Sequence, residues 1–431
     1  MIHLKIVSVK AFGCYSFAST ELYTREEKYK ARTKGIEVPS LSKHPSFSKA
    51  LYEAEKFGKD LGIDKSLGQK KFELFIKDIT DFTCLVLCES STDDTVFTML
   101  KFALWLFTLD DRVDKRKGGI SSEQMISMTK NFLEIVKGHK ETDLKSDSID
   151  RTLQALKVIL NKASSTYFEI DREPIKRFRL KFEEYLKSIE KECENEEQKI
   201  KWTIESYTEN RRSSGAVEPF FEMIFILNSI NVHKLKDRQD RIKALIKCAN
   251  NIIVWDNDVY SLNKEKEDGL PNNLVMVYMD QGYNEKEACD MVIEKIKKEI
   301  TEFNQACFAA KKCFKTRKDP EDYKVLLKII GIVERVIYGN LIWSKTNIRY
   351  ADSKSKSMKL SKDVHRMNNE NLRPNKTHFY DWEEFKFERE KSGSSVISTD
   401  SSESDYKSSS TLFDHDLSCF LTGKIIGIKY R

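Results

Sequence analysis

Apolar residues recur three and four positions apart through most of the chain. This spacing places them on one side of a helix, and short polar breaks separate one segment from the next. The pattern predicts a series of packed helices between about residue 46 and residue 352. The clearest predicted helices are residues 96–109, 122–136, 149–160, 241–260 and 323–342.

The two ends of the chain differ from this central part. Residues 1–45 close with VPSLSKHPS, whose two prolines disfavour helix, and we expect an N-terminal extension. Residues 353–431 contain GSSVISTDSSESDYKSSS, which is too polar to offset the entropy lost on ordering. We therefore expect one helical domain at 46–352, followed by a low-complexity, disordered tail.

Composition supports an all-α fold. Seven prolines and 16 glycines are too few for many tight turns between strands, whereas a hydrophobic fraction of 40% and 25 phenylalanines can fill a large core. The net charge of +6 is thinly dispersed, so we expect no nucleic-acid partner.

We expect neither a targeting segment nor a membrane span from this sequence. The N-terminus lacks a convincing cleavage site, and no run reaches the roughly 18 apolar residues of a membrane span. The nine cysteines are scattered, without histidine at metal-ligand spacing, and we interpret them as reduced packing residues. We therefore expect a cytoplasmic protein without an integral membrane segment.

A first group of acidic residues follows an apolar helical segment in FALWLFTLDDRVD. Asp110 and Asp114 are one helical turn apart, so their carboxylates project from one face, and Asp111 lies beside them. Hard oxygen ligands grouped in this way suit Mg2+, whose coordination shell is completed by water and by phosphate oxygens of a substrate. The alternative for this group alone is an acidic helix end on the surface.

A second polar group is the series Asn257, Ser261 and Glu265. Steps of four residues keep the three side chains on one side of a helix over two turns. An amide, a hydroxyl and a carboxylate together form a site for one hard cation, although a polar stripe on an exposed helix has the same pattern. The apolar run at 252–255 argues against full exposure of this helix.

These two groups resemble the aspartate-rich and Asn-Ser-Glu metal motifs of microbial-type class I terpene synthases. Two further features agree with the resemblance. Arg211, in NRRSSGA, precedes Asn257 by the interval at which that family keeps a diphosphate-sensing arginine, and Gly215 follows four positions later. The helical region ends in WSKTNIRY, whose Arg349 and Tyr350 resemble the family's closing pair.

The resemblance implies a single class I terpenoid synthase bundle of helices around a central active-site cavity. It implies three Mg2+ ions, two bridged by Asp110 and a third held by Asn257, Ser261 and Glu265, with Asp111 and Asp114 in support. The expected diphosphate ligands are Arg211, Lys264, Arg349 and Tyr350. It also suggests that Gly215 exposes a carbonyl to a carbocation.

The register of the arginine motif has one complication, because Arg212 adjoins Arg211 and Ser214 stands where the family often has aspartate. Spacing to Asn257 and Gly215 favours Arg211. Aromatic faces are suited to a carbocation, and Phe107 shares the helix face of Asp110. Further aromatic candidates, with core packing as the alternative, are Phe82, Phe102, Trp105 and Trp343.

The implied activity is ionisation of a prenyl diphosphate, with release of diphosphate and conversion of the cation to a terpene. The sequence does not distinguish substrates of ten, fifteen and twenty carbons. We prefer farnesyl diphosphate, with fifteen, by analogy with the family. The oligomeric state stays open, a homodimer included. One rival is a chain-elongating prenyl diphosphate synthase, which needs a second aspartate-rich motif. The other is a non-catalytic helical scaffold.

Overall fold

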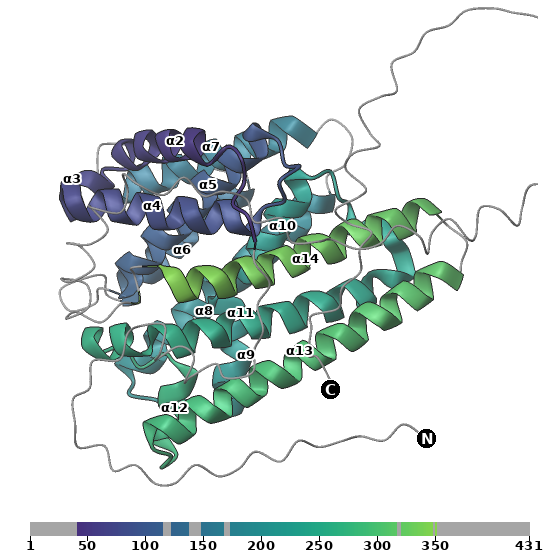
Figure 1. The fold of residues 1–431 in the computed structure, drawn as a ribbon. Helices are drawn as coiled ribbons and strands as arrows, with labels where there is room; N and C mark the ends of the chain where they lie inside the picture. Colours follow the sequence, from purple (N-terminus) through teal and green to yellow (C-terminus); the bar gives the residue numbers. More distant parts are fainter. Residues whose placement is uncertain are drawn as a thin grey trace, which may run out of the picture. The chain divides into compact units, whose positions relative to one another are not determined.

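The computed structural model describes residues 41–114, 122–137, 148–167, 173–316, 320–347 and 350, and regular structure in these ranges is helical throughout (Figure 1). The helices are α2 (Phe47–Asp60), α3 (Ile63–Leu67), α4 (Gln69–Val86), α5 (Asp93–Asp114), α6 (Ser122–Lys137), α7 (Ser148–Tyr167), α8 (Glu173–Glu197), α9 (Ile204–Ser214), α10 (Val217–Leu227), the 3-10 helix η1 (Val232–Arg238), α11 (Gln239–Asp268), α12 (Leu274–Asp280), α13 (Glu285–Thr316) and α14 (Pro320–Thr346).

The all-α prediction is confirmed, and each of the five clearest predicted helices lies within α5, α6, α7, α11 or α14. The spacing of apolar residues alone predicts helices that are shorter than the observed ones. Helix α11 continues to Asp268 and ends where Gly269 adopts a left-handed conformation with φ of 72°. The expected tail at 353–431 and the expected extension up to residue 40 lie outside the described residues.

Packing in the described part of the chain begins before the first helix. The His44 side chain is buried, its backbone N–H donates to the Cys84 carbonyl at 2.9 Å, and its Nε2 lies 2.9 Å from the Ser91 carbonyl. The short segment before α2 is thereby attached to the end of α4 and the loop that follows it.

Helices α11 and α14 are the elements around which the helical unit is arranged. Helix α11 packs against α13, α14 and α12, and α14 lies between α11 and α4 (Figure 1). Helix α5 packs on α4, α2 and α7, while α8 packs on α6, α9 and α10. Trp343 of α14 donates from its indole Nε1 to the Asp78 carbonyl of α4 at 2.8 Å, which fixes these two helices together.

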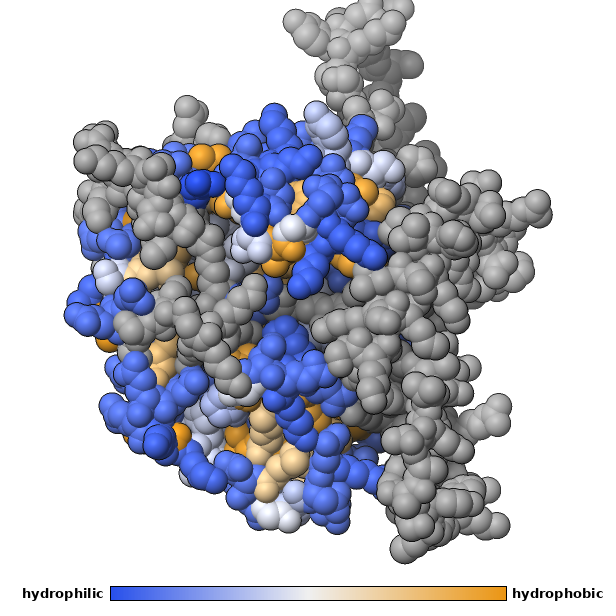
Figure 2. Space-filling view, turned by 90° about the vertical axis from the view of Figure 1, so that its left-hand side faces the viewer, coloured by the Kyte–Doolittle hydropathy of each residue, from blue (hydrophilic) through white to orange (hydrophobic). Residues whose placement is uncertain are grey.

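The described surface on the left-hand side of Figure 1 is mainly polar. In Figure 2 hydrophilic residues predominate in the coloured part of that face, with hydrophobic residues between them. Among the residues that the structure describes, no helix has both the length and the apolar character to cross a membrane.

A close backbone contact joins α14 to α4 at Gly339. A Cβ atom at this position would lie 2.9 Å from the Leu85 carbonyl carbon and oxygen, and 2.8 Å from Val86 Cγ1. Two of these neighbours are backbone atoms, which cannot rotate away. The glycine therefore sets the distance between the two helices.

We expect Gly339→Ala to destabilise the protein by about 1–3 kcal/mol, because overpacking outweighs the better helix propensity of alanine. Urea unfolding followed by circular dichroism measures this change. Lys324→Ala, at an exposed position of the same helix, is the control and should change stability by less than about 0.5 kcal/mol. Equal stability of Gly339→Ala and the wild type would contradict the close contact.

Candidate active site

The described helices surround a cavity of about 170 Å³, measured as the space open to the centre of a water molecule. Its lining residues come from α4, α5, α8, α9, α10, α11 and α14 and from the segments next to them. Its wall divides into two kinds of residue. The apolar lining includes Phe82, Ala103, Leu106, Phe107, Phe220, Ile253, Val254, Val336 and Trp343. The polar lining includes Asp110, Glu192, Arg211, Asn257, Ser261, Lys264, Glu265, Asn272, Asn340 and Tyr350.

Helix α11 brings the second polar group to this cavity. Asn257, Ser261 and Glu265 all line it, and the Ser261 hydroxyl donates to the Asn257 carbonyl at 2.8 Å. The Glu265 carboxylate accepts from Asn273 Nδ2 at 2.6 Å. These three residues, the α11 stripe, therefore face a cavity. The alternative of an exposed polar helix face does not apply to them.

The first acidic group is only partly described. Asp110 is exposed and lines the cavity, whereas the half-buried Asp111 does not line it. Asp114 ends α5, but its side chain lies outside the described residues. Phe107, one turn before Asp110, lines the cavity as the shared helix face predicts.

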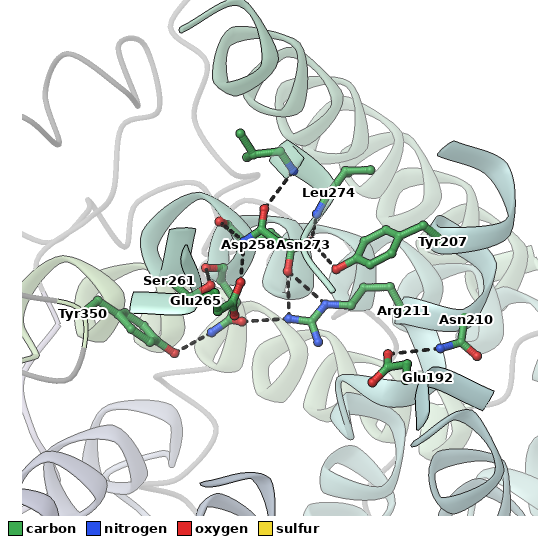
Figure 3. A network of polar contacts seen from close by, with 12 residues as sticks. Glu192, Tyr207, Asn210, Arg211, Asp258, Ser261, Glu265, Asn273, Leu274 and Tyr350 are labelled. Atoms are coloured by element: carbon green, nitrogen blue, oxygen red, sulfur yellow. Dashed lines mark hydrogen bonds and ion pairs between the residues drawn. The ribbon is translucent and has the colours of Figure 1, made fainter. Parts of the chain in front are cut away.

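Arg211 reaches from α9 to α11 and makes three polar contacts there (Figure 3). Its Nε and Nη2 lie 3.0 and 2.8 Å from Asp258 Oδ1, and Nη2 also donates to Asn257 Oδ1 at 2.8 Å. Burial disfavours the charged guanidinium, but the negative groups around it, Asp258 first among them, together outweigh this effect, and the pKa of Arg211 is raised well above its ordinary value.

Arg212 points elsewhere. It does not line the cavity, and its Nε donates to Asn251 Oδ1 at 2.9 Å, on the part of α11 that precedes the cavity-facing stripe. The two arginines are separated because adjacent helical residues point about 100° apart. The geometry therefore agrees with the register in which Arg211 faces the cavity.

Asp258 holds Arg211 in place and was not singled out from the sequence. This carboxylate is fully buried, and its Oδ2 accepts from the Tyr207 hydroxyl at 2.9 Å and from the Leu274 backbone N–H at 3.0 Å (Figure 3). Asn273 adds a link by donating to the Asp258 carbonyl at 2.7 Å. These partners come from α9 and from the start of α12, so sequence spacing could not reveal them.

Two of the remaining expected diphosphate ligands, Lys264 and Tyr350, line the same cavity. Tyr350 lines the cavity and its hydroxyl is hydrogen-bonded to Asn257 Nδ2, while Lys264 lines it and pairs with Asp268 at 3.1 Å. Arg349 lies outside the described residues. Tyr350 and the α11 stripe therefore meet at one end of the cavity.

The α11 stripe fits a hard cation in its donor chemistry. Its three side chains offer an amide oxygen, a hydroxyl and a carboxylate. Burial and the charge of Asp258 raise the pKa of Glu265 to about 7, although Arg211 opposes them. A carboxylate whose negative charge is disfavoured in this way gains from a neighbouring cation. A metal ion at Asn257 Oδ1 would compete with the Arg211 donor for the same oxygen.

Gly215 separates α9 from α10 at the cavity wall. Its φ of −73° is ordinary, and the left-handed residue is Ala216, with φ of 54°. A Cβ atom on Gly215 would clash with Val254 Cγ1, so the glycine allows the close approach to α11. Residue 219 is a proline, which has no N–H to donate to the Gly215 carbonyl, as a continuing helix would require.

The aromatic candidates divide into two sets. Phe82 and Trp343 line the cavity with Phe107, and the three rings contact one another with centroids 5.1–5.6 Å apart. Phe102 and Trp105 are fully buried, do not line the cavity and stack on each other. For these last two, core packing is the observed role.

Comparison with known proteins relates this helical fold to that of terpene synthases. A family model described as terpene synthase family 2, C-terminal metal binding, matches residues 101–302. Germacradien-4-ol synthase from Streptomyces citricolor has the same fold, with a TM-score of 0.60 at 19% identity, covering 73% of this chain and 99% of that chain. This is the all-α class I terpenoid synthase fold.

Relatives of known name extend the comparison. Sesquiterpene synthase 6 from Postia placenta is 26% identical over 185 residues, which cover 42% of this chain and about half (52%) of that protein. The (+)-T-muurolol synthase from Roseiflexus castenholzii is 28% identical over 258 residues, covering 59% of this chain and 75% of that protein. Over the matched region the chain is similar to microbial-type class I terpene synthases, and the matching family model describes a metal-binding domain.

We expect Asp258→Asn to lower the free energy of unfolding by about 2–4 kcal/mol, because it leaves Arg211 buried without its counter-charge. Urea unfolding measures the change. Asp268→Asn is the control, because it removes the partly exposed partner of Lys264 and should have a much smaller effect. Similar losses for the two variants would mean that the buried pair does not organise the site.

Proposed function

We propose that this protein is a Mg2+-dependent terpene synthase that ionises a prenyl diphosphate, releases diphosphate and converts the carbocation to a terpene. The proposal is carried by one cavity whose lining combines a connected polar group, Arg211, the α11 stripe and Tyr350, with many aromatic and aliphatic side chains. This arrangement supports lyase chemistry, in which a charged leaving group and a reactive cation need opposite environments.

Metal binding is assigned to oxygen ligands from two helices. Asn257, Ser261 and Glu265 of α11 would hold one ion, and Asp110 of α5, supported by Asp111 and Asp114, would hold the others. Bound Mg2+ would supply positive charge that stabilises the leaving diphosphate without any proton transfer. Hard oxygen donors and a phosphate-bearing substrate favour Mg2+ over softer metals.

The diphosphate itself would be bound by Arg211, Lys264, Arg349 and Tyr350. Arg211 is prepared for this role because Asp258 and Tyr207 fix its guanidinium before substrate arrives, so little freedom is lost on binding. Its planar group can donate to two phosphate oxygens at once. These charges would neutralise the oxygens that gain negative charge as the allylic C–O bond breaks.

The carbocation would then be held against the apolar wall. The faces of Phe82, Phe107 and Trp343 are electron-rich and attract positive charge without forming a bond. The Gly215 carbonyl is a further candidate, because Pro219 cannot occupy it as a helix donor. Closely packed apolar residues would also keep water from quenching the cation early.

Farnesyl diphosphate is the substrate that we prefer. The relative from Roseiflexus castenholzii is named as cyclizing (2E,6E)-farnesyl diphosphate, and so is the 4-epi-cubebol synthase of Streptosporangium roseum. A chain-elongating synthase is disfavoured because Asn257, Ser261 and Glu265 occupy the position of its second aspartate-rich motif. A non-catalytic scaffold is disfavoured because it has no need to keep Arg211 and Asp258 buried.

We expect product formation to require a divalent ion and to fall by at least about 100-fold in Asn257→Ala, because a proposed metal ligand is lost. The measurement is gas chromatography of products from geranyl, farnesyl and geranylgeranyl diphosphate with Mg2+, with circular dichroism as the check on folding. Full turnover in excess chelator would remove the proposal. An unchanged yield from Asn257→Ala would limit the α11 stripe to a structural role.

We expect Arg211→Lys to slow single-turnover ionisation by at least about tenfold, because lysine cannot donate to two phosphate oxygens in a fixed plane. Arg212→Lys is the matched control and should be nearly silent, since Arg212 contacts Asn251 away from the cavity. Both variants are compared at saturating Mg2+. A larger defect in Arg212→Lys would show that the assigned register is wrong by one residue.

A further inference from the structure

One polar side chain interrupts the apolar wall that α14 contributes. Val336, Asn340 and Trp343 lie one turn apart on this helix, and all three line the cavity. Asn340 is 5% exposed, so it is surrounded by protein apart from the cavity. A buried amide is costly among apolar neighbours unless its polar atoms are used.

The amide nitrogen of Asn340 is used by a residue outside the cavity. Asn340 Nδ2 donates to Asp256 Oδ2 at 3.2 Å across the contact between α14 and α11. Asp256 is fully buried and does not line the cavity. With the nitrogen fixed in this way, the carbonyl oxygen is the polar atom that Asn340 offers to the cavity.

A fixed carbonyl oxygen in an apolar wall has a specific electrostatic effect. The negative end of its dipole stabilises positive charge nearby, and low local polarity strengthens this effect. Because Asp256 restrains the amide, no free energy is spent on turning the dipole when charge develops. Unlike water, the amide oxygen is anchored and cannot leave as part of the product.

We propose that Asn340 is a specificity-determining residue that stabilises a cation formed after ionisation, and that Asp256 is the positioning residue that holds its amide. This inference rests on the proposed terpene synthase activity. The end of the cavity assigned to the diphosphate contains Arg211 and Tyr350, whereas Asn340 lies among apolar residues of α14. Its loss should therefore change the products more than the rate of ionisation.

The test compares product ratios with diphosphate release in the full-length protein. Asn340→Leu keeps the side-chain size but removes the dipole. The share of the main wild-type product should fall by at least about threefold in favour of products from earlier cations, while diphosphate release stays within about threefold of the wild type. Asp256→Leu, which changes no cavity-lining residue, should shift the products in the same direction.

Two further variants separate positioning from a general structural role. Asp256→Asn retains an oxygen that can accept from Asn340 Nδ2 and should give nearly wild-type products. The double variant Asn340→Leu/Asp256→Leu should match Asn340→Leu alone, because Asp256 acts through the amide. If Asp256→Leu does not fold by circular dichroism, Asn340→Leu and Asp256→Asn still decide the question.

Unchanged products from folded Asn340→Leu, with normal diphosphate release, would overturn this inference and leave the proposed function intact. Unchanged products from Asp256→Leu together with a higher Mg2+ requirement would assign Asp256 to support of its neighbour Asn257 and would also overturn it. No diphosphate release from any prenyl diphosphate by the wild type would instead refute the proposed function, and the inference with it.

Discussion

The candidate site depends on a buried charge pair between Arg211 and Asp258. Placing a guanidinium inside a helical bundle is unfavourable unless its charge is balanced and its donors are bound. Asp258 does both, and Tyr207 and the Leu274 N–H complete the carboxylate's own hydrogen bonds. The pair ties α9, α11 and the start of α12 together at the place where the α11 stripe faces the cavity.

The same pair explains why the polar end of the cavity can lie next to an apolar wall. The charge of Arg211 is balanced by Asp258, so the aromatic and aliphatic part of the lining supplies no counter-ion for it. The contacts among Phe82, Phe107 and Trp343 then form a continuous aromatic surface from α4, α5 and α14. Asn340 is the exception on that wall, and Asp256 satisfies its amide nitrogen.

Sequence reasoning was most informative where function depends on periodicity within one helix. The steps from Asn257 to Glu265 and the separation of Arg211 from Arg212 follow from helical geometry, which the chain itself specifies. Contacts between helices were not accessible in this way. In the sequence Asp258 is one of several acidic residues near Asn257, and nothing local to it indicates Tyr207 as its partner. The sequence motif predicts a role for Gly215, but the close approach of Gly215 to Val254 follows only from the fold.

The contact at Gly339 has a consequence for how the cavity could change in volume. Backbone atoms of α4 already touch α14 at this glycine, so α14 has no room to move back toward α4. A bulkier side chain at the neighbouring cavity position Val336 must therefore project into the space open to substrate instead of pushing its helix outward. A larger side chain on this wall would therefore shorten the cavity directly, and the length of the molecule that fits would fall with each added methyl group.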